Sequence, residues 1–298
     1  MGLKERILAD FEKNPVLKTG FFECENCGNN TFNYREKFSF EKTFLEIKKN
    51  ILKIFQGKIG NFFDKKNFFE SKKIFIPGIK IGKFEDLKFG KEVVFEDFDI
   101  DKNGKEFLRK ELGFEKHLWI VDKKGFPPIF ICDNHNHVLE SWKFFKGEKT
   151  QMIHIDQHRD NAKYLNPVVD FRRDLRICDY INFAIDEKWV SEKYISLCEM
   201  QDFDKYFEKN FFGNGKNFGD CEKIFSEFEE KFLWGKKIIL NIDLDIFVDY
   251  QTIVNHQKIF ELIKFLKNKV DLISIASSPL FLKKEEVFGL LKRILEEK

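Results

Sequence analysis

The side chains best suited to metal chemistry lie in the stretch Met152-Ile-His-Ile-Asp-Gln-His-Arg-Asp160. They come at every second position, which is the period of a β-strand: His154, Asp156, His158 and Asp160. Two imidazoles and two carboxylates on one strand face need partners, because ionised carboxylates side by side repel one another. One divalent cation, or a pair, satisfies all of them, and imidazole with carboxylate suits Zn, Mn or Fe better than Ca or Mg. The alternative is a solvated strand end.

A second acidic stretch has the same design. The apolar run 237–247 carries Asp243 and Asp245 near its end, and the apolar strand 129–133 is followed by His135. Two imidazoles and four carboxylates exceed what one tetrahedral metal needs, and they suit two cations roughly 3.5–4 Å apart. Because two cations lower the pKa of a water that they share, the pattern implies hydrolysis at a planar carbon.

The elements that must position these residues alternate between strands and helices. Strands are expected at 118–122, 129–133, 152–160, 194–198, 237–247 and 270–276, and helices at 138–145, 176–189, 221–233, 253–266 and 283–295. Apolar strands that alternate with helices predict an α/β fold with three layers (α/β/α) and a mainly parallel sheet. Ligands of such sheets bind beyond the carboxyl ends of the strands, which is where the polar residues lie.

The N-terminal part of the chain follows another pattern. Residues 1–110 are predicted to form an accessory extension, and residues 111–298 the hydrolase domain, with a domain boundary expected in the turn-rich segment 99–104. Residues 4–13 and 41–57 have helical spacing. Cys24 and Cys27 form half of a zinc knuckle, and two thiols in a turn are at least as good an interpretation.

Composition excludes several classes of protein. The 298 residues include 52 basic and 50 acidic ones, a net charge of +2, which favours neither nucleic acid nor a membrane surface as a partner. No apolar run approaches the roughly 18 residues of a membrane span. No secretory signal is recognisable, and the six cysteines are scattered, so reduced thiols and a cytoplasmic protein are expected. The expected partner is a small-molecule or peptide substrate.

Taken together, these motifs resemble a known family. His135, then Asp156-x-His158-x-Asp160, then Asp243-x-Asp245, in this order and each at a strand end, look like the arginase–deacetylase (ureohydrolase) superfamily. The segments 133–139, 154–160 and 241–247 look more like its largely uncharacterised branch that includes the peptide arginases, which remove urea from arginine side chains in peptides. The resemblance covers about residues 117–280 and implies an arginase-like fold with manganese as the usual metal.

The resemblance also implies roles for single residues. One metal would be held by His135, Asp156, Asp160 and Asp243, and the other by Asp156, His158, Asp243 and Asp245. Asp160 would in addition accept a proton from the water between them. His154 and His137 are the other catalytic candidates: His154 shares a strand face with Asp156, and His137 is placed to shuttle protons or to cap a helix. His117 and His256 are expected at the surface.

Departures from the family pattern bear on the substrate. The turn after the last core strand, Ser277-Ser278-Pro279, has no carboxylate to hold a guanidinium, and Asp243-x-Asp245 is followed by Asp249 rather than by Asp-Pro. Free L-arginine is therefore not the expected substrate, whereas an arginine side chain within a peptide, or another guanidino or amide compound, stays open. Two other functions stay open as well: a single-zinc amide deacetylase that uses Asp156, His158 and Asp243, and a metal-stabilised binding module without turnover.

Overall fold

A seven-stranded sheet forms the centre of the computed structural model, which describes residues 2–13, 22–24, 74–100, 106–148, 150–158, 160–164, 168, 171, 175, 177–192, 194–198, 237–248 and 256–296. The strand order is β3-β6-β7-β11-β10-β8-β9. The strands are β3 (Gly78–Ile81), β6 (Lys116–Ile120), β7 (Ile129–Cys132), β8 (Gln151–Asp156), β9 (Ile195–Cys198), β10 (Ile238–Asp243) and β11 (Leu272–Ala276). Every neighbouring pair is parallel except β6 with β7. The predicted α/β class with a mainly parallel sheet is confirmed.

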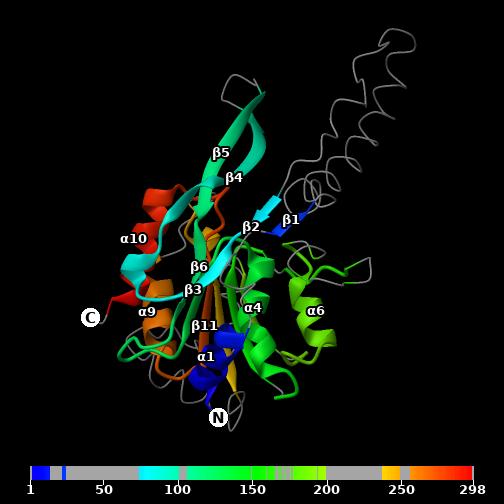
Figure 1. Cartoon of the computed structure of the whole chain (residues 1–298), viewed down its shortest axis with the longest axis vertical. Helices are drawn as coiled ribbons and strands as arrows, with labels where there is room; N and C mark the ends of the chain where they lie inside the picture. The colour runs from blue at the N-terminus through cyan, green and yellow to red at the C-terminus, as the bar shows by residue number, and fades with distance from the viewer. Residues whose placement is uncertain are drawn as a thin grey trace, which may run out of the picture.

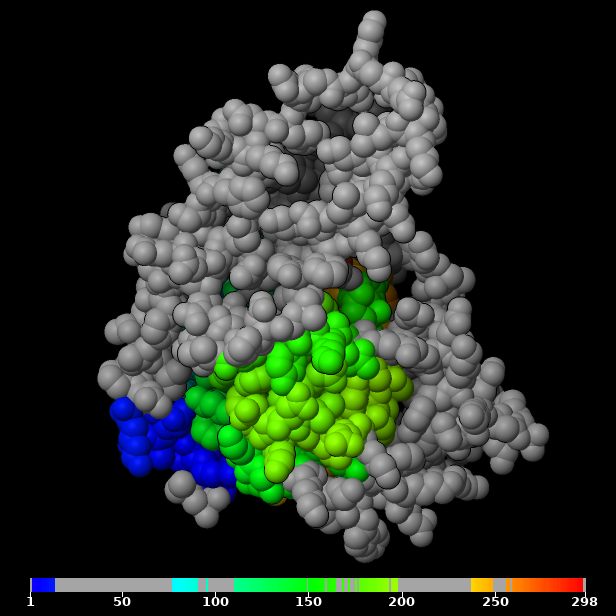
Figure 2. Space-filling model, turned by 90° about the vertical axis from the view of Figure 1, so that its right-hand side faces the viewer, coloured from blue at the N-terminus to red at the C-terminus, as the bar shows by residue number. Residues whose placement is uncertain are grey.

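Helices cover both faces of this sheet (Figure 1). One face carries α9 (His256–Leu266) and α10 (Lys284–Leu295), and the other carries α1 (Leu3–Lys13), α4 (Leu139–Trp142) and α6 (Tyr180–Asp186). In Figure 2, which looks onto the side of α6, its yellow-green atoms form part of the surface, as an outer layer does. None of the helices in the described segments is both long and apolar enough to cross a bilayer.

Each strand contributes side chains to two separate cores, because successive side chains point to opposite faces of the sheet. In β8, Ile153 and Ile155 pack with α9 and α10, whereas Met152 packs with α4 and α6. The same alternation in β10 and β11 gives two apolar layers, so the three-layer arrangement follows from strand parity. His154 and Asp156 share the parity of Met152, and therefore belong to the face that α4 and α6 cover.

Strands β8 and β10 end earlier than the sequence predicts, and both end in the same way. The Asp156 carboxylate accepts a hydrogen bond from the His158 backbone N–H at 2.6 Å, and Asp243 accepts one from the Asp245 N–H at 3.0 Å. An aspartate that binds the N–H two residues ahead forms a local turn that competes with the extended strand. The prediction of one strand through Asp160 is therefore wrong, because the chain turns directly after Asp156.

Helices also differ from their predicted bounds. Residues 138–145 form three short pieces, η2 (His135–Val138), α4 and η3 (Lys143–Phe145), and the predicted helix 176–189 is reduced to α6. The acidic end of the strand 237–247 is the helical turn η6 (Leu244–Phe247). The predicted helices 41–57 and 221–233 and the side chains of Cys24 and Cys27 lie outside the described part of the chain.

Parts of the N-terminal segment belong to the same unit as the sheet. Strand β3 is an edge strand of the main sheet, and Ile7 of α1 is buried in the core beside α4. The predicted boundary at 99–104 lies between β4 (Phe89–Ile100) and β5 (Glu106–Phe114), which pair antiparallel. The other described elements here are β1 (Phe22–Cys24), paired antiparallel with β2 (Ile74–Ile76), and the turn η1 (Phe84–Asp86). An accessory role for the remainder of residues 1–110 stays a prediction.

Candidate metal centre

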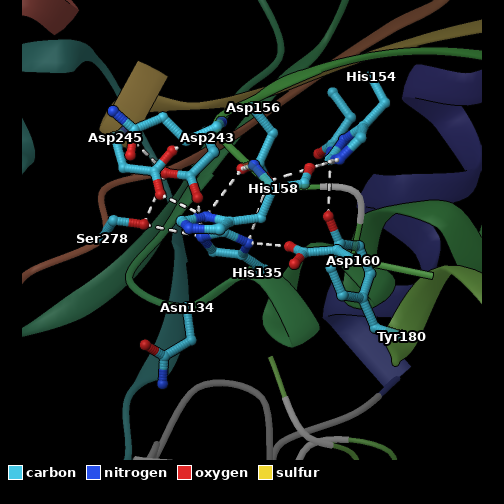
Figure 3. Close-up of polar contacts among 12 residues, drawn as sticks. Asn134, His135, His154, Asp156, His158, Asp160, Tyr180, Asp243, Asp245 and Ser278 are labelled. Atoms are coloured by element: carbon cyan, nitrogen blue, oxygen red, sulfur yellow. Dashed lines mark hydrogen bonds and ion pairs between the residues drawn. The ribbon is translucent and has the colours of Figure 1, made fainter. Parts of the chain in front are cut away.

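Six side chains with metal-ligating atoms converge where β7, β8 and β10 end (Figure 3). They fall into three groups whose ligand atoms lie within 4.8 Å of one another: His135, Asp243 and Asp245; His135, Asp156 and Asp160; and Asp156, His158 and Asp245. All are buried except His158, whose side chain is 29% exposed. The structure thus brings together every residue that the sequence proposed as a metal ligand.

The two imidazoles lie on either side of Asp156. His135 Nδ1 is 3.3 Å from Asp156 Oδ2 and contacts Asp160, while its Nε2 faces Asp243. His158 Nδ1 is 3.4 Å from Asp156 Oδ1 and 3.0 Å from Asp245 Oδ2. Each oxygen of Asp156 therefore faces a different imidazole, so this carboxylate lies between the two histidines.

The electrostatics of the cluster fit divalent cations. Oδ2 of Asp156, of Asp243 and of Asp245 is buried, and an imidazole nitrogen faces each of these three oxygens. Burial raises the pKa of Asp243 well above its usual range, with the charge of Asp245 adding to the effect. Burial likewise raises the pKa of Asp160 to about 7, helped by the charge of Asp156. Four buried carboxylates beside two imidazoles need extra positive charge to be ionised together, which is what bound cations supply.

Two residues at the site have backbone angles in the left-handed region, with φ of 43° at Asp160 and 49° at Ser278. Such angles cost roughly 1–3 kcal/mol each and persist where surrounding contacts impose them. After Asp160, the Asn182 amide of α6 donates to the carbonyls of Asn161 and Ala162 at 2.6 and 3.1 Å. Helix α6 therefore holds the segment that presents the Asp160 carboxylate.

Ser278 occupies the turn after β11 in which the sequence shows no carboxylate. Its Oγ donates to Asp243 Oδ1 at 2.6 Å and lies 2.8 Å from His135 Nε2. The serine thus connects a ligand that follows β7 with a ligand at the end of β10. The sequence pointed to this turn but not to the contact, because a Ser-Ser-Pro turn is common in loops of any function.

His154 lies beneath the ligands and not among them. Its ring is fully buried, with Nε2 3.1 Å from the His158 carbonyl oxygen and 3.5 Å from Asp156 Oδ2. Burial lowers the pKa of His154. Its Nδ1 is 3.0 Å from the amide nitrogen of Asn241, a residue that the sequence did not single out.

The remaining histidines have different surroundings. His137 is buried in η2, with its ring centroid 4.9 Å from that of His117. The expectation of a surface position for His117 is wrong: the ring is 1% exposed, lies 3.5 Å from Asp133 Oδ2, and packs edge-on against Phe130. Burial lowers the pKa of His117 to about 3, against the attraction of Glu140. His256 is half-buried against the ring of Phe247.

The chain shows little similarity to known proteins. No family model matches the chain, and no curated protein matches it. Among solved structures, the proclavaminate amidino hydrolase of Streptomyces clavuligerus is similar, with a TM-score of 0.38 and 14% sequence identity. The match covers 56% of this chain and 62% of that one, less than two thirds of its length.

Proposed function

We propose that this chain is a metal-dependent hydrolase of a non-peptide C–N bond, with an arginase-like pair of cations. The observation that carries the proposal is the convergence of six ligating side chains at the ends of three strands of one sheet, where buried carboxylate oxygens and imidazole nitrogens face one another. Bound divalent cations, most simply Mn²⁺, would supply Lewis-acid activation of a water molecule and of the bond to be cleaved.

In this proposal the residues of the site have different roles. Asp156 sits between the two imidazoles and holds both halves of the centre together. Asp160, on its left-handed turn, is the proposed proton acceptor for the attacking water, since its carboxylate reaches the centre from the loop rather than from a strand. His154 and His137 keep no direct catalytic part in this proposal: His154 supports the ligand turn from below, and the His137 ring packs against His117.

The favoured substrate is a guanidino group on an arginine side chain within a peptide. His158 is the most exposed ligand, and its ring centroid lies 5.9 Å from that of Phe281. A substrate that approaches on this side passes the ring of Phe281, an apolar surface that suits the aliphatic stem of a long side chain. The absence of a carboxylate from the turn Ser277-Ser278-Pro279 argues against tight binding of free L-arginine.

The stoichiometry of bound metal separates this proposal from a single-zinc deacetylase. A deacetylase site would use Asp156, His158 and Asp243 and would leave the other three ligands without a function. In the structure, His158 groups with Asp156 and Asp245 instead, and all six residues take part. Elemental analysis of protein purified with added manganese should therefore give about two metal ions per chain, and a value of one would favour the deacetylase.

The activity test uses the manganese-loaded full chain and a panel of an arginine-containing peptide, free L-arginine and an acetyl-lysine peptide. We expect urea from the arginine peptide, and a loss of about 100-fold or more in Asp160→Asn, because a positioned general base contributes about that much. Asp122→Asn is the matched control, since Asp122 is exposed and pairs with Lys4 at the surface. If no urea, acetate or ammonia forms, the proposed activity is wrong and a binding module becomes the better hypothesis.

A further inference from the structure

A row of buried polar side chains crosses the sheet directly beneath the metal ligands. The register of the strands places Asn241 of β10 between His154 of β8 and Ser274 of β11. All three side chains are at most 2% exposed. They lie on the face that packs against α4 and α6, among apolar neighbours such as Met152 and Leu272. A polar row in such a place costs free energy unless its hydrogen bonds are made.

The two ends of this row have fixed hydrogen-bond chemistry. At one end, the indole Nε1–H of Trp142 in α4 donates to Ser274 Oγ at 3.0 Å, and an indole nitrogen can only donate. At the other end, the backbone carbonyl of His158 lies 3.1 Å from His154 Nε2, and a carbonyl can only accept. A donor at the first end and an acceptor at the last fit hydrogen bonds that all run in one direction, from Trp142 toward His158.

The direction determines every group along the row. Because Ser274 Oγ accepts from Trp142, its own hydrogen is directed to Asn241 Oδ1, at 2.8 Å. The Asn241 amide nitrogen then faces two acceptors for its two hydrogens, His154 Nδ1 at 3.0 Å and the Tyr180 hydroxyl at 3.1 Å. With Nδ1 as acceptor, the His154 ring carries its hydrogen on Nε2, the atom that faces the carbonyl of His158 and Asp156 Oδ2.

The row ends on the turn that presents the metal ligands. The backbone of His158 is held at both polar groups: its N–H donates to Asp156, and its carbonyl accepts from His154. We propose that the hydrogen-bond chain from Trp142 through Ser274 and Asn241 holds His154 as the Nε2–H tautomer and so positions the turn 156–160, which carries three of the six ligands. Asn241 and His154 are then positioning residues, and their effect on metal affinity rests on the proposed metal centre.

The first experiment reads the tautomer directly, by NMR of the metal-free full chain with ¹⁵N-labelled histidine. We expect His154 to carry hydrogen on Nε2 in the wild type and to lose this preference in Asn241→Leu, which cannot donate. Manganese affinity, measured by calorimetry, should fall by about 10–100-fold in the same variant. Thr150→Val is the matched control: it removes another fully buried hydroxyl next to β8, and it should change neither readout.

The second experiment replaces the histidine and needs no folded Asn241 variant. A glutamine amide nitrogen is as many bonds from Cβ as His Nε2, so His154→Gln can still donate to the His158 carbonyl, whereas His154→Leu cannot. We expect manganese affinity close to wild type in His154→Gln and about 10–100-fold weaker in His154→Leu.

Three results would overturn the inference: an Nδ1–H tautomer in the wild type, wild-type manganese affinity in a folded Asn241→Leu, or equal affinities in the two His154 variants. A wild-type chain that binds no metal would instead sink the proposed function, while the tautomer measurement would still decide whether the hydrogen-bond chain has the inferred direction.

Discussion

At the scale of single residues, Ser278 is the hydroxyl that joins His135 to Asp243. Ser278→Ala removes a donor to one ligand and a partner of the other, so we expect manganese affinity to fall by about 10-fold or more, as measured by calorimetry. Ser141→Ala removes an equally buried hydroxyl, which donates to the Val138 carbonyl, and should cost about 1 kcal/mol of stability without weakening metal binding. Equal manganese affinity in Ser278→Ala and the wild type would contradict the contact's role.

His117 makes stability depend on pH. Burial lowers the pKa of its folded ring to about 3, whereas an unfolded histidine titrates near about 6.5. The unfolded chain therefore binds an extra proton below pH 6.5, so this stability is present above that pH and is lost as pH falls toward 3. His117→Leu should lower the slope of unfolding free energy against pH by about 1.4 kcal/mol per unit near pH 5, measured by urea unfolding. At pH 7–8 the slopes should agree, and an unchanged slope at pH 5 would refute the argument.

At the scale of elements, the apolar strands and their polar ends could be predicted from the sequence. Runs such as 129–132 and 238–243 are buried on both faces, and such strands are visible as continuous apolar segments. The ends of these strands could not be predicted in detail. Alternation of His154, Asp156, His158 and Asp160 has the period of a strand, but the Asp156 carboxylate captures the His158 N–H and turns the chain. The period of two residues does not distinguish a strand that continues through Asp160 from one that turns after Asp156.

Positions that depend on partners far away in the chain were the hardest to predict. His117 has no supporting context in its own segment, and is buried because Asp133 and Phe130 surround it. In the sequence, Asn241 and Ser274 each appear as one polar residue in an apolar strand. They lie in one row with His154 only because β8, β10 and β11 are neighbours in the sheet. Strand parity is the signal that could have found them, once β8, β10 and β11 are known to be neighbours.

Helix α1 shows how an element from the N-terminal segment supports the sheet. Ile7 is buried beside α4, and Arg6 donates to the Phe144 carbonyl at 2.7 Å and to Glu148 at 2.6 Å. Ile7→Ala should lower the unfolding free energy by about 2–5 kcal/mol, because it leaves a cavity at a buried site. Urea unfolding measures this, and the exposed substitution Lys13→Ala should change it by less than about 0.5 kcal/mol. Equal losses in both variants would mean that α1 does not pack as described.

At the scale of the whole molecule, the proposed metal centre would couple folding to metal binding. Its ligands come from β7, β8 and β10, all interior strands of the seven-stranded sheet. A ligand that binds only the folded chain stabilises it by about 2.7 kcal/mol at a concentration 100 times its Kd. Manganese at that excess should raise the unfolding free energy of the full chain by this amount, and a chelator should reverse the gain. A metal-independent unfolding curve would contradict a preformed site.

The same coupling predicts that, without metal, a variant that lacks one metal-ligating carboxylate is at least as stable as the wild type. Asp243 and Asp245 lie side by side in a buried cluster of four carboxylates, so their repulsion opposes folding when no cation is bound. Asp243→Asn keeps an oxygen to accept from Ser278 and Asp245 but removes one negative charge. Urea unfolding with chelator should show Asp243→Asn at least as stable as the wild type, and added manganese should reverse the order, since only the wild type gains its full binding energy. If Asp243→Asn is less stable than the wild type under both conditions, the carboxylates stabilise the fold through their hydrogen bonds. The buried charges would then not be an example of a binding site that lowers the stability of the metal-free protein.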